Sequence, residues 1–474
     1  MKLKILHFFK NKSVEIFLLA FSLILIIISR NYPFYWDNIV QISVPANWYF
    51  DTNFNYFFLP DDIATGHPTF IGMYFAAIWK LFGKSLFVTH LAMFPFVFGL
   101  AIQINQLIRN LEIQKNTGFV ILIFVLLDTT LLSQMSLITF EVFQLFFYIL
   151  CINAILNNKK HILSIAFLCL VLTSLRGTIC GGGIVLFHII YDFYKYRNFV
   201  LKRYIPYLLG IFAIIAFLFY FYFEKGWVVH NTVSNAWKES AEFASPMEIL
   251  RNIGVFAWRL VDFGRVIIFV FFALFIFKLI KERKYENSTL RTLFLIIVSQ
   301  FVVIFPIIII YKNPFGHRYF IPIIIPVFIL VILWVNLFNK EKKIFLTLAF
   351  TCLISGHFWL YSKKTAQGWD ASTIHWNYFN VRNKMLKYLN ENEININNIG
   401  TFFPNTDSVK YIDLDTKDIR FKDANINEDN FILYSNAFNV EDVIIDALNT
   451  KKKWSIIKEF RLNRIYLRLY KKND

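Results

Sequence analysis

Residues 319–338 read YFIPIIIPVFILVILWVNLF, a run of 20 residues without a charged side chain. A helix of about 20 apolar residues is long enough to cross the hydrocarbon core of a bilayer. Similar apolar runs recur through the first 361 residues, and 57% of the 474-residue chain is hydrophobic while only 17% is charged. Soluble domains carry about 25% charged residues. The composition therefore excludes a single soluble domain, a disordered chain and a fibre, and it predicts a polytopic α-helical membrane protein.

The net charge of +17 is spread unevenly along the chain. Residues 1–361 carry 31 basic and 17 acidic residues, mostly in short loops between the apolar runs, whereas residues 362–474 carry 18 and 15. Basic loops mark the cytoplasmic side of a membrane protein, so the distribution favours membrane orientation over nucleic-acid binding. With these loops inside, the sequence predicts eleven spans, near 14–30, 86–107, 118–134, 138–156, 162–176, 181–193, 205–223, 264–281, 292–311, 319–338 and 344–361.

This arrangement predicts two further features. The basic segment 1–13 becomes the cytoplasmic flank of a retained first span, since no small-residue cleavage site follows it. Residues 68–82 are apolar but short for a span and end in Trp79-Lys80, which indicates a re-entrant or juxtamembrane helix on the outer face. An odd number of spans places the C-terminal tail on the extracytoplasmic side.

The polar tail alternates helical and strand-like segments. Apolar spacing predicts helices near 379–389 and 440–448, and strands near 397–403, 431–434, 454–460 and 464–470, with the last two strands antiparallel. We therefore predict a multi-spanning transmembrane domain over residues 1–361 and a small extracytoplasmic α/β domain over residues 362–474.

Acids near the predicted outer face are the first candidates for chemistry. Asp37 lies just beyond the first span, where an outward-facing carboxylate can take a proton from an acceptor hydroxyl or amine. A solvated loop acid or a helix cap is the alternative interpretation of Asp37. Glu141 begins an apolar span, where an ionised group is costly and suggests function, unless it only pairs with a buried arginine. Asp62, in the same outer loop as Asp37, is a further candidate.

Two arginines lie at predicted outer ends of spans, against the usual charge bias. Arg176 precedes the glycine-rich residues 177–183, and Arg318 lies in Gly316-His317-Arg318-Tyr319-Phe320. A guanidinium group suits phosphate oxygens, and glycine allows a ligand to approach the backbone closely. Interfacial snorkelling, or pairing with the acids above, is the alternative. Acids beside cations at the outer face suit a substrate that is both lipid-anchored and phosphorylated.

In the order of its motifs the chain resembles the GT-C membrane glycosyltransferases, and among them the protein O-mannosyltransferase and lipid A aminoarabinose transferase family (glycosyltransferase family 39). The likeness covers roughly residues 1–340. The matching features are the early acid Asp37, Gly66-His67-Pro68-Thr69 before a helix ending Trp79-Lys80-Leu81-Phe82-Gly83, the acid Glu141, and Arg318-Tyr319 followed by Pro322 and Pro326. Two departures are Asn38, where the family commonly has Glu, and Thr69, where it has a second proline.

The resemblance implies transfer of a sugar from a polyprenyl-phosphate donor to a glycan, lipid or protein acceptor at the extracytoplasmic face of a membrane, and we expect the transfer to be inverting. The loop charges and the absence of a cleavage site favour a bacterial inner membrane. Asp37 would be the base or orient the acceptor, and Glu141 would lie near the donor. A role for a second acid beside Asp37 would fall to Asp61, to Asp62 or to no residue. The residues expected to contact the donor phosphate are Arg176, Arg318, Tyr319, His317 and His67. No resident cofactor is implied, and help from a divalent metal is left open.

Two other classes of protein stay open. A lipid or polysaccharide transporter would spread its charged residues through the depth of the membrane, whereas here they gather at one predicted face. A non-catalytic assembly subunit would bind a partner through its outer domain, and changes at Asp37 and Glu141 would then be silent. The absence of a Walker loop, GxGxxG, GxSxG or zinc-ligand spacing gives no support to ATP hydrolysis, hydride transfer or serine hydrolysis.

Overall fold

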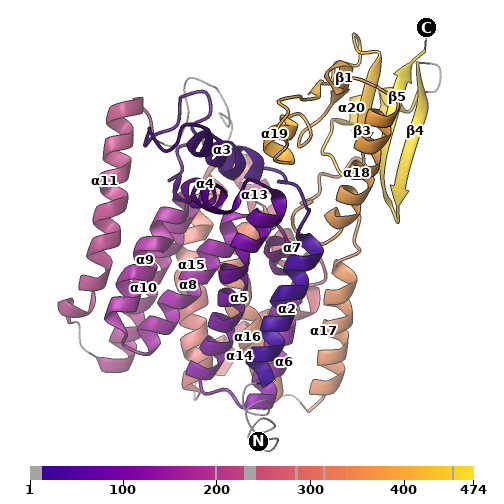
Figure 1. The fold of residues 1–474 in the computed structure, drawn as a ribbon. Coiled ribbons are helices and arrows are strands. Elements are labelled where there is room, and N and C mark those ends of the chain that lie inside the picture. The colour runs from indigo at the N-terminus through magenta and orange to yellow at the C-terminus, as the bar shows by residue number, and fades with distance from the viewer. Residues whose placement is uncertain are drawn as a thin grey trace, which may run out of the picture.

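The computed structural model describes residues 13–197, 200–228, 242–282, 287–312, 316–338, 340–450 and 453–473, so most of the basic segment 1–13 lies outside the described residues. A helical bundle is followed by a small α/β unit at the C-terminus (Figure 1). The bundle contains α2 (Ser13–Ser29), α3 (Val44–Asp51), α4 (Phe70–Phe82), α5 (Leu86–Asn110), α6 (Lys115–Leu126), α7 (Thr129–Ser136), α8 (Phe140–Leu156), α9 (Lys160–Thr173), α10 (Leu175–Tyr196), α11 (Leu208–Lys225), α13 (Pro246–Val261), α14 (Val266–Glu282), α15 (Ser288–Ile310), α16 (Ile321–Phe338) and α17 (Lys342–Gly356). Short helical turns are η1 (Ile39–Ser43), η2 (Leu201–Arg203), η3 (Ile205–Tyr207) and η4 (His317–Phe320).

The apolar helices confirm a polytopic membrane protein. Within the described residues, five helical segments are long and apolar enough to cross a membrane, and seven if each of two bent pairs is one span. A helix overlaps each of the eleven predicted spans, but α2, α8 and α9 are shorter than 18 residues, so the number eleven stays a prediction. Residues 70–82 form a short apolar helix, α4, as expected.

The bundle is built around α16. In the segment His317–Phe338, 83% of the most apolar stretch is buried, against 33% for Leu201–Lys225, which includes the peripheral helix α11 (Figure 1). Isoleucine, leucine and valine on all sides of α16 pack against neighbouring helices, which is why this helix lacks an amphipathic pattern. Arg318, directly before α16, is therefore placed at the centre of the bundle.

Two pairs of consecutive helices are strongly bent. The span expected over 118–134 breaks between α6 and α7, whose axes differ by 65°, because the Asp128 carboxylate caps α7 by accepting the Leu131 backbone N–H at 2.9 Å. Helix α13, which the sequence placed in an outer loop, meets α14 at 110°. Gly264 makes this turn with φ +84°, and a Cβ there would collide with the Cys352 backbone.

The C-terminal unit has a five-stranded sheet in the order β2-β1-β3-β5-β4. Strand β1 is parallel to β2 and β3, while β5 is antiparallel to β3 and β4. The small α/β unit expected from the sequence is confirmed, and β2 and α19 are additions to it. The elements are α18 (His375–Glu391), η5 (Ile396–Asn398), β1 (Ile399–Thr401), α19 (Val409–Ile412), β2 (Lys422–Asp423), β3 (Phe431–Ser435), α20 (Asp442–Leu448), β4 (Trp454–Leu462) and β5 (Ile465–Lys472).

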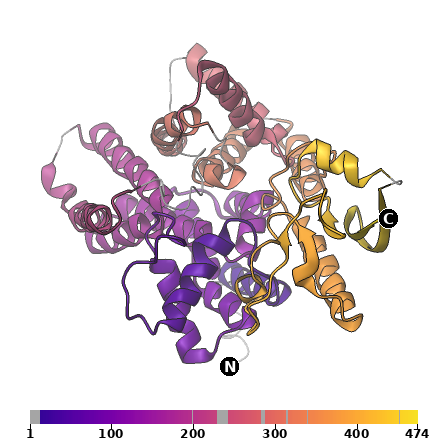
Figure 2. The same ribbon diagram turned by 90° about the horizontal axis from the view of Figure 1, so that it is seen from above.

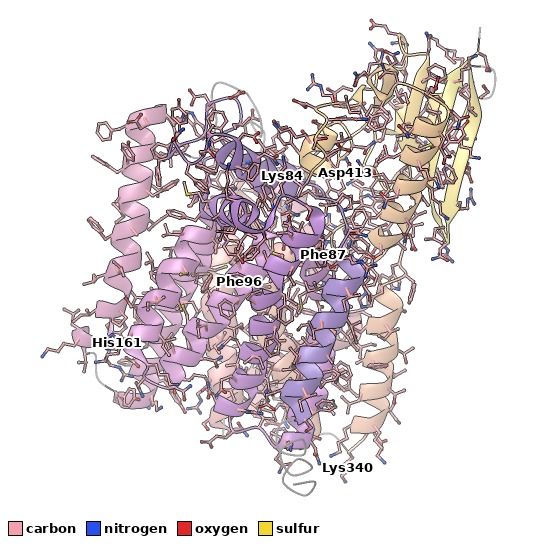
Figure 3. The ribbon with its side chains drawn as sticks, in the orientation of Figure 1. Lys84, Phe87, Phe96, His161, Lys340 and Asp413 are labelled. Carbon is pink, nitrogen blue, oxygen red and sulfur yellow. The ribbon has the colours of Figure 1, made fainter. Side chains whose placement is uncertain are left out.

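The C-terminal unit lies at one end of the bundle (Figure 1) and is displaced to one side of it (Figure 2). Two hydrogen bonds attach helix α19 to the segment between α2 and α3. The Phe34 backbone N–H donates to the Ile412 carbonyl at 2.9 Å, and the Ser43 hydroxyl donates to the Tyr411 carbonyl at 2.6 Å. Figure 3 shows Lys84 and Asp413 at this end of the bundle, and His161 and Lys340 at the opposite end. The predicted outer and inner loops thus lie at opposite ends, and their orientation in a membrane stays a prediction.

Candidate functional site

Arg318 is the centre of a buried cluster of charges. Its guanidinium contacts the carboxylates of Asp37 and Asp370, and its Nε lies 3.2 Å from Glu141 Oε1. Asp37 precedes η1, Glu141 lies in the first turn of α8, and Asp370 lies between α17 and α18. Three segments far apart in the sequence therefore meet at one arginine, which is only 8% exposed.

Arg176 extends the cluster from the start of α10. Its Nη1 donates to Glu141 Oε1 and its Nη2 donates to Gln41 Oε1 at 3.3 Å. The guanidinium carbons of Arg176 and Arg318 lie 4.4 and 5.2 Å from the centre of the Tyr319 ring. The Tyr319 ring and the shared acid Glu141 thus hold the two cations close together. We call Asp37, Glu141, Arg176, Arg318 and Asp370 the charge cluster.

Asp370 is anchored on two sides. Besides Arg318, its carboxylate accepts from the Gln134 amide at 3.3 Å, and its backbone carbonyl accepts from Ser133 Oγ at 2.6 Å and from Gln134 Nε2 at 2.8 Å. Burial alone would raise the pKa of Asp370, but the Arg318 guanidinium outweighs burial and the pKa lies below its ordinary value. With every group ionised, the charge cluster carries three negative and two positive charges.

A pocket of about 400 Å³ adjoins the charge cluster. One end is polar, with both arginines, Tyr319, Glu141 and Gln144, and the rest of the wall is mainly isoleucine. The apolar lining residues are Ile179, Cys180, Ile304, Ile307 and Ile308, from α10 and α15. Its lining therefore places cationic groups beside an apolar wall, which is the combination that suits an anionic group on a hydrocarbon chain.

His67 lies beside the charge cluster. Its Nδ1 accepts from the Leu175 backbone N–H at 3.4 Å, at the start of the helix that carries Arg176. Burial, and next the charge of Arg176, lower the pKa of His67 to about 3. His67 is therefore neutral at physiological pH and can donate or accept a hydrogen bond without adding charge.

The structure places two predicted residues away from the charge cluster. His317 Nε2 bonds Asp262 Oδ2 at 2.7 Å, because its ring points from η4 into a second polar network. Asp262 in that network also accepts from the Tyr361 hydroxyl. Asp62 is exposed, and within the described residues it takes part in no ion pair, whereas its neighbour Asp61 pairs with Lys225 at 3.0 Å.

Sequence reasoning missed Asp370 and the second network. Asp370 follows the last apolar run, in a polar segment where a single acid is unremarkable, so no local signal distinguished it. Asp128, inside the span predicted over 118–134, pairs with Arg265, whose Nε lies 2.6 Å from Asp128 Oδ2. Within the described residues, no three His, Cys, Asp or Glu side chains are grouped to hold a metal ion.

The fold is similar to those of two solved structures. ArnT from Cupriavidus metallidurans, solved bound to undecaprenyl phosphate, matches with a TM-score of 0.50 and 12% identity over 73% of this chain and 63% of ArnT. The mycobacterial arabinofuranosyltransferase AftD matches with a TM-score of 0.49 and 8% identity over 97% of this chain and 40% of AftD. The chain therefore spans less than two thirds of either protein. No protein-family profile and no curated protein matches the sequence.

The match to ArnT identifies the class of fold. The chain has a GT-C-type membrane glycosyltransferase fold, which confirms at the level of architecture the resemblance that the motifs indicated. The roles of individual residues rest on the geometry above.

Proposed function

We propose that the chain is a membrane glycosyltransferase, which moves a sugar from a polyprenyl-phosphate donor to an acceptor at the extracytoplasmic face with inversion. The observation that carries this proposal is the charge cluster beside a pocket with one ionic end and one apolar end. Its components come from separate segments, so the fold itself gathers them. A lipid phosphate matches both ends of the pocket at once.

The donor phosphate is assigned chiefly to Arg176. Arg318 already contacts three carboxylates, whereas Arg176 contacts one and lines the pocket with its guanidinium over Tyr319. The charge of Arg176 is therefore less neutralised by carboxylates than that of Arg318, and more of its N–H groups can donate to phosphate oxygens. The isoprenoid chain would lie along Ile304, Ile307 and Ile308. The undecaprenyl phosphate bound to ArnT, which has a similar fold, agrees with this class of ligand.

Asp37 is assigned the role of base. Arg318 contacts its Oδ2, and within the described residues Oδ1 has no hydrogen-bond partner, so Oδ1 is left to accept a proton. The acceptor oxygen or nitrogen would lose its proton to Asp37 as it bonds to the anomeric carbon of the sugar. The bond from that carbon to the phosphate oxygen breaks at the same time, and polyprenyl phosphate leaves with the electron pair. Arg176 stabilises the negative charge on the leaving phosphate.

Asp370 and Glu141 are assigned as positioning residues. Asp370 contacts Nη1 of Arg318 and Glu141 lies at its Nε, so together with Asp37 at Nη2 they fix the guanidinium. Glu141 also holds Arg176. A cluster fixed in this way needs little reorganisation during the reaction, which is how preorganised charges lower a barrier.

The donor assignment is tested by binding. The purified protein in lipid nanodiscs is titrated with undecaprenyl phosphate, and in parallel with undecaprenol, which lacks the phosphate. We expect saturable binding of the phosphate and at least about tenfold weaker binding of the alcohol, because charge-assisted hydrogen bonds contribute about 1.5–3 kcal/mol. Equal affinity for the two lipids would contradict the assignment.

A further inference from the structure

A second pocket lies in the C-terminal unit and encloses about 1230 Å³, including open solvent. None of the charge-cluster residues lines it. Its walls come from the loop before α19, from α19 itself, and from the segment that leads into the edge strand β2. The lining residues that matter here are Asn397, Asp407, Tyr411, Asp418, Arg420 and Asp423.

Most of the charged side chains of this pocket are not used by the fold. In the described part of the chain, the side chains of Asp407, Asp418, Asp423 and Arg420 make no hydrogen bond and no ion pair. Lys422, by contrast, is paired with Asp429 at 2.5 Å. The pocket therefore presents three free carboxylates and one free guanidinium, an excess of negative charge.

The surroundings of Asp407 disfavour its charged form. Burial, and next the nearby Asp423 carboxylate, raise the pKa of Asp407, while Arg420 acts in the opposite direction. A partly buried acid beside another acid costs folding stability at neutral pH. Asp418, Arg420 and Asp423 are exposed, so only Asp407 bears this cost. A partly buried acid that satisfies no internal partner is typical of a binding site, where a ligand supplies the missing partner.

We propose that this pocket binds a saccharide without anionic groups. The saccharide would be the part of the acceptor that the protein holds during sugar transfer, so this inference rests on the proposed function. Carboxylate and amide side chains bond sugar hydroxyls, and the half-buried ring of Tyr411 offers an apolar face for a sugar ring. The excess of carboxylates repels phosphates and uronic acids. The lining has only two aromatic residues and no aliphatic wall, so it does not suit a lipid chain.

The place of the pocket agrees with an acceptor glycan. Its wall is attached to the segment that carries Asp37, since Tyr411 accepts from Ser43 at 2.6 Å and the rings of Phe403 and Trp36 lie 5.0 Å apart. A glycan held here would be held against the same segment as the proposed base.

The proposal is tested by glycan binding, independently of transfer. Full-length protein in detergent is labelled and applied to an array of neutral, amino-bearing and uronic-acid or phosphorylated oligosaccharides. We expect binding to neutral or amino-bearing members and none to the anionic ones. Asp407→Asn should reduce that binding at least about tenfold, since a hydrogen bond to a charged group is lost. Its thermal stability should be unchanged or higher, because the unfavourable acid pair is removed.

Two control variants separate this proposal from the proposed function. Glu428→Gln alters an exposed acid outside the pocket and should leave glycan binding unchanged. Asp37→Asn should abolish transfer and keep glycan binding. Absence of glycan binding by the wild-type protein, binding only of anionic glycans, or equal binding by Asp407→Asn would overturn the pocket assignment, whatever the transfer assay shows.

Discussion

The carboxylate of Asp370, in the segment that joins the bundle to the C-terminal unit, contacts the guanidinium of Arg318 at the start of the central helix. Asp37 and Glu141, which precede Arg318 in the sequence, contact the same guanidinium. The C-terminal unit is therefore joined to the proposed active site by a buried ion pair, in addition to its surface contacts. A movement of that unit that displaces Asp370 would therefore change the contacts of Arg318.

Removing the charge of Asp370 should impair catalysis more than donor binding. In Asp370→Asn, Arg318 is shared by two carboxylates instead of three, so it stabilises the ionised form of Asp37 more strongly and weakens Asp37 as a base. We expect kcat to fall by about tenfold or more, the KM for the donor to change little, and the acid limb of the pH–rate profile to move to lower pH.

The matched control for Asp370 is Asp446→Asn, which removes an exposed acid that pairs with Lys364 in the same unit. This control should behave as wild type. A purely structural role for Asp370 predicts a lower yield of folded protein with an unshifted pH profile, and that result would reject the positioning role.

The contribution of Asp370 to stability should depend on pH with a definite sign. Its pKa is lowered in the folded state, and a carboxyl group of this kind stabilises the fold above its unfolded pKa of about 3.9 and loses that effect as the pH falls through the folded value. Thermal unfolding of wild type and Asp370→Asn should therefore show a gap in Tm that is constant from about pH 8 to 5 and shrinks below about pH 4. A gap that widens on acidification would contradict this interpretation.

Arg176 should govern donor affinity. Arg176→Ala removes the cation assigned to the phosphate, so undecaprenyl phosphate should bind about 10–100-fold more weakly, while Arg176→Lys should be intermediate because ammonium lacks the bidentate fork. Titration in nanodiscs measures both. Arg109→Ala is the control, since Arg109 is exposed and pairs with Glu15. Unchanged affinity in Arg176→Ala would remove this residue from the donor site.

The pair of Asp128 and Arg265 should matter for stability. Both side chains are almost fully buried, with 3% and 0% exposure, and removal of one partner leaves the other charge unpaired. Asp128→Ala should therefore destabilise the fold by about 3–5 kcal/mol. Glu15→Gln breaks an exposed pair and should cost at most about 1 kcal/mol. Thermal unfolding in detergent compares the two, and equal shifts in Tm would show that burial of the first pair is unimportant.

The sequence predicted the components of the site that stand out against an apolar background. Glu141, Arg176 and Arg318 are charged residues next to long apolar runs, where burial makes a charge costly and therefore informative. Asp37 was chosen for its place after the first span. The structure brings all four together, although no local pattern could say which acid meets which arginine.

The sequence could not predict features that depend on three-dimensional context. Asp370 lies in a polar segment, where an acid has no distinctive surroundings until Arg318 is placed against it. The break at Asp128 lies inside a continuous apolar run, and the cap and the partner Arg265 explain it only once the helices are packed. His317 and Arg318 are adjacent in sequence, yet their side chains enter different networks.

The central claim is tested most directly by sugar transfer with Asp37→Asn. Wild-type and variant protein in proteoliposomes are given labelled polyprenyl-phosphate sugars together with envelope acceptors, and both release of polyprenyl phosphate and labelling of the acceptor are measured. We predict transfer by the wild type, and in the variant a loss of about 10²–10⁴-fold with undiminished binding of undecaprenyl phosphate. Wild-type rates of transfer by Asp37→Asn would contradict the account.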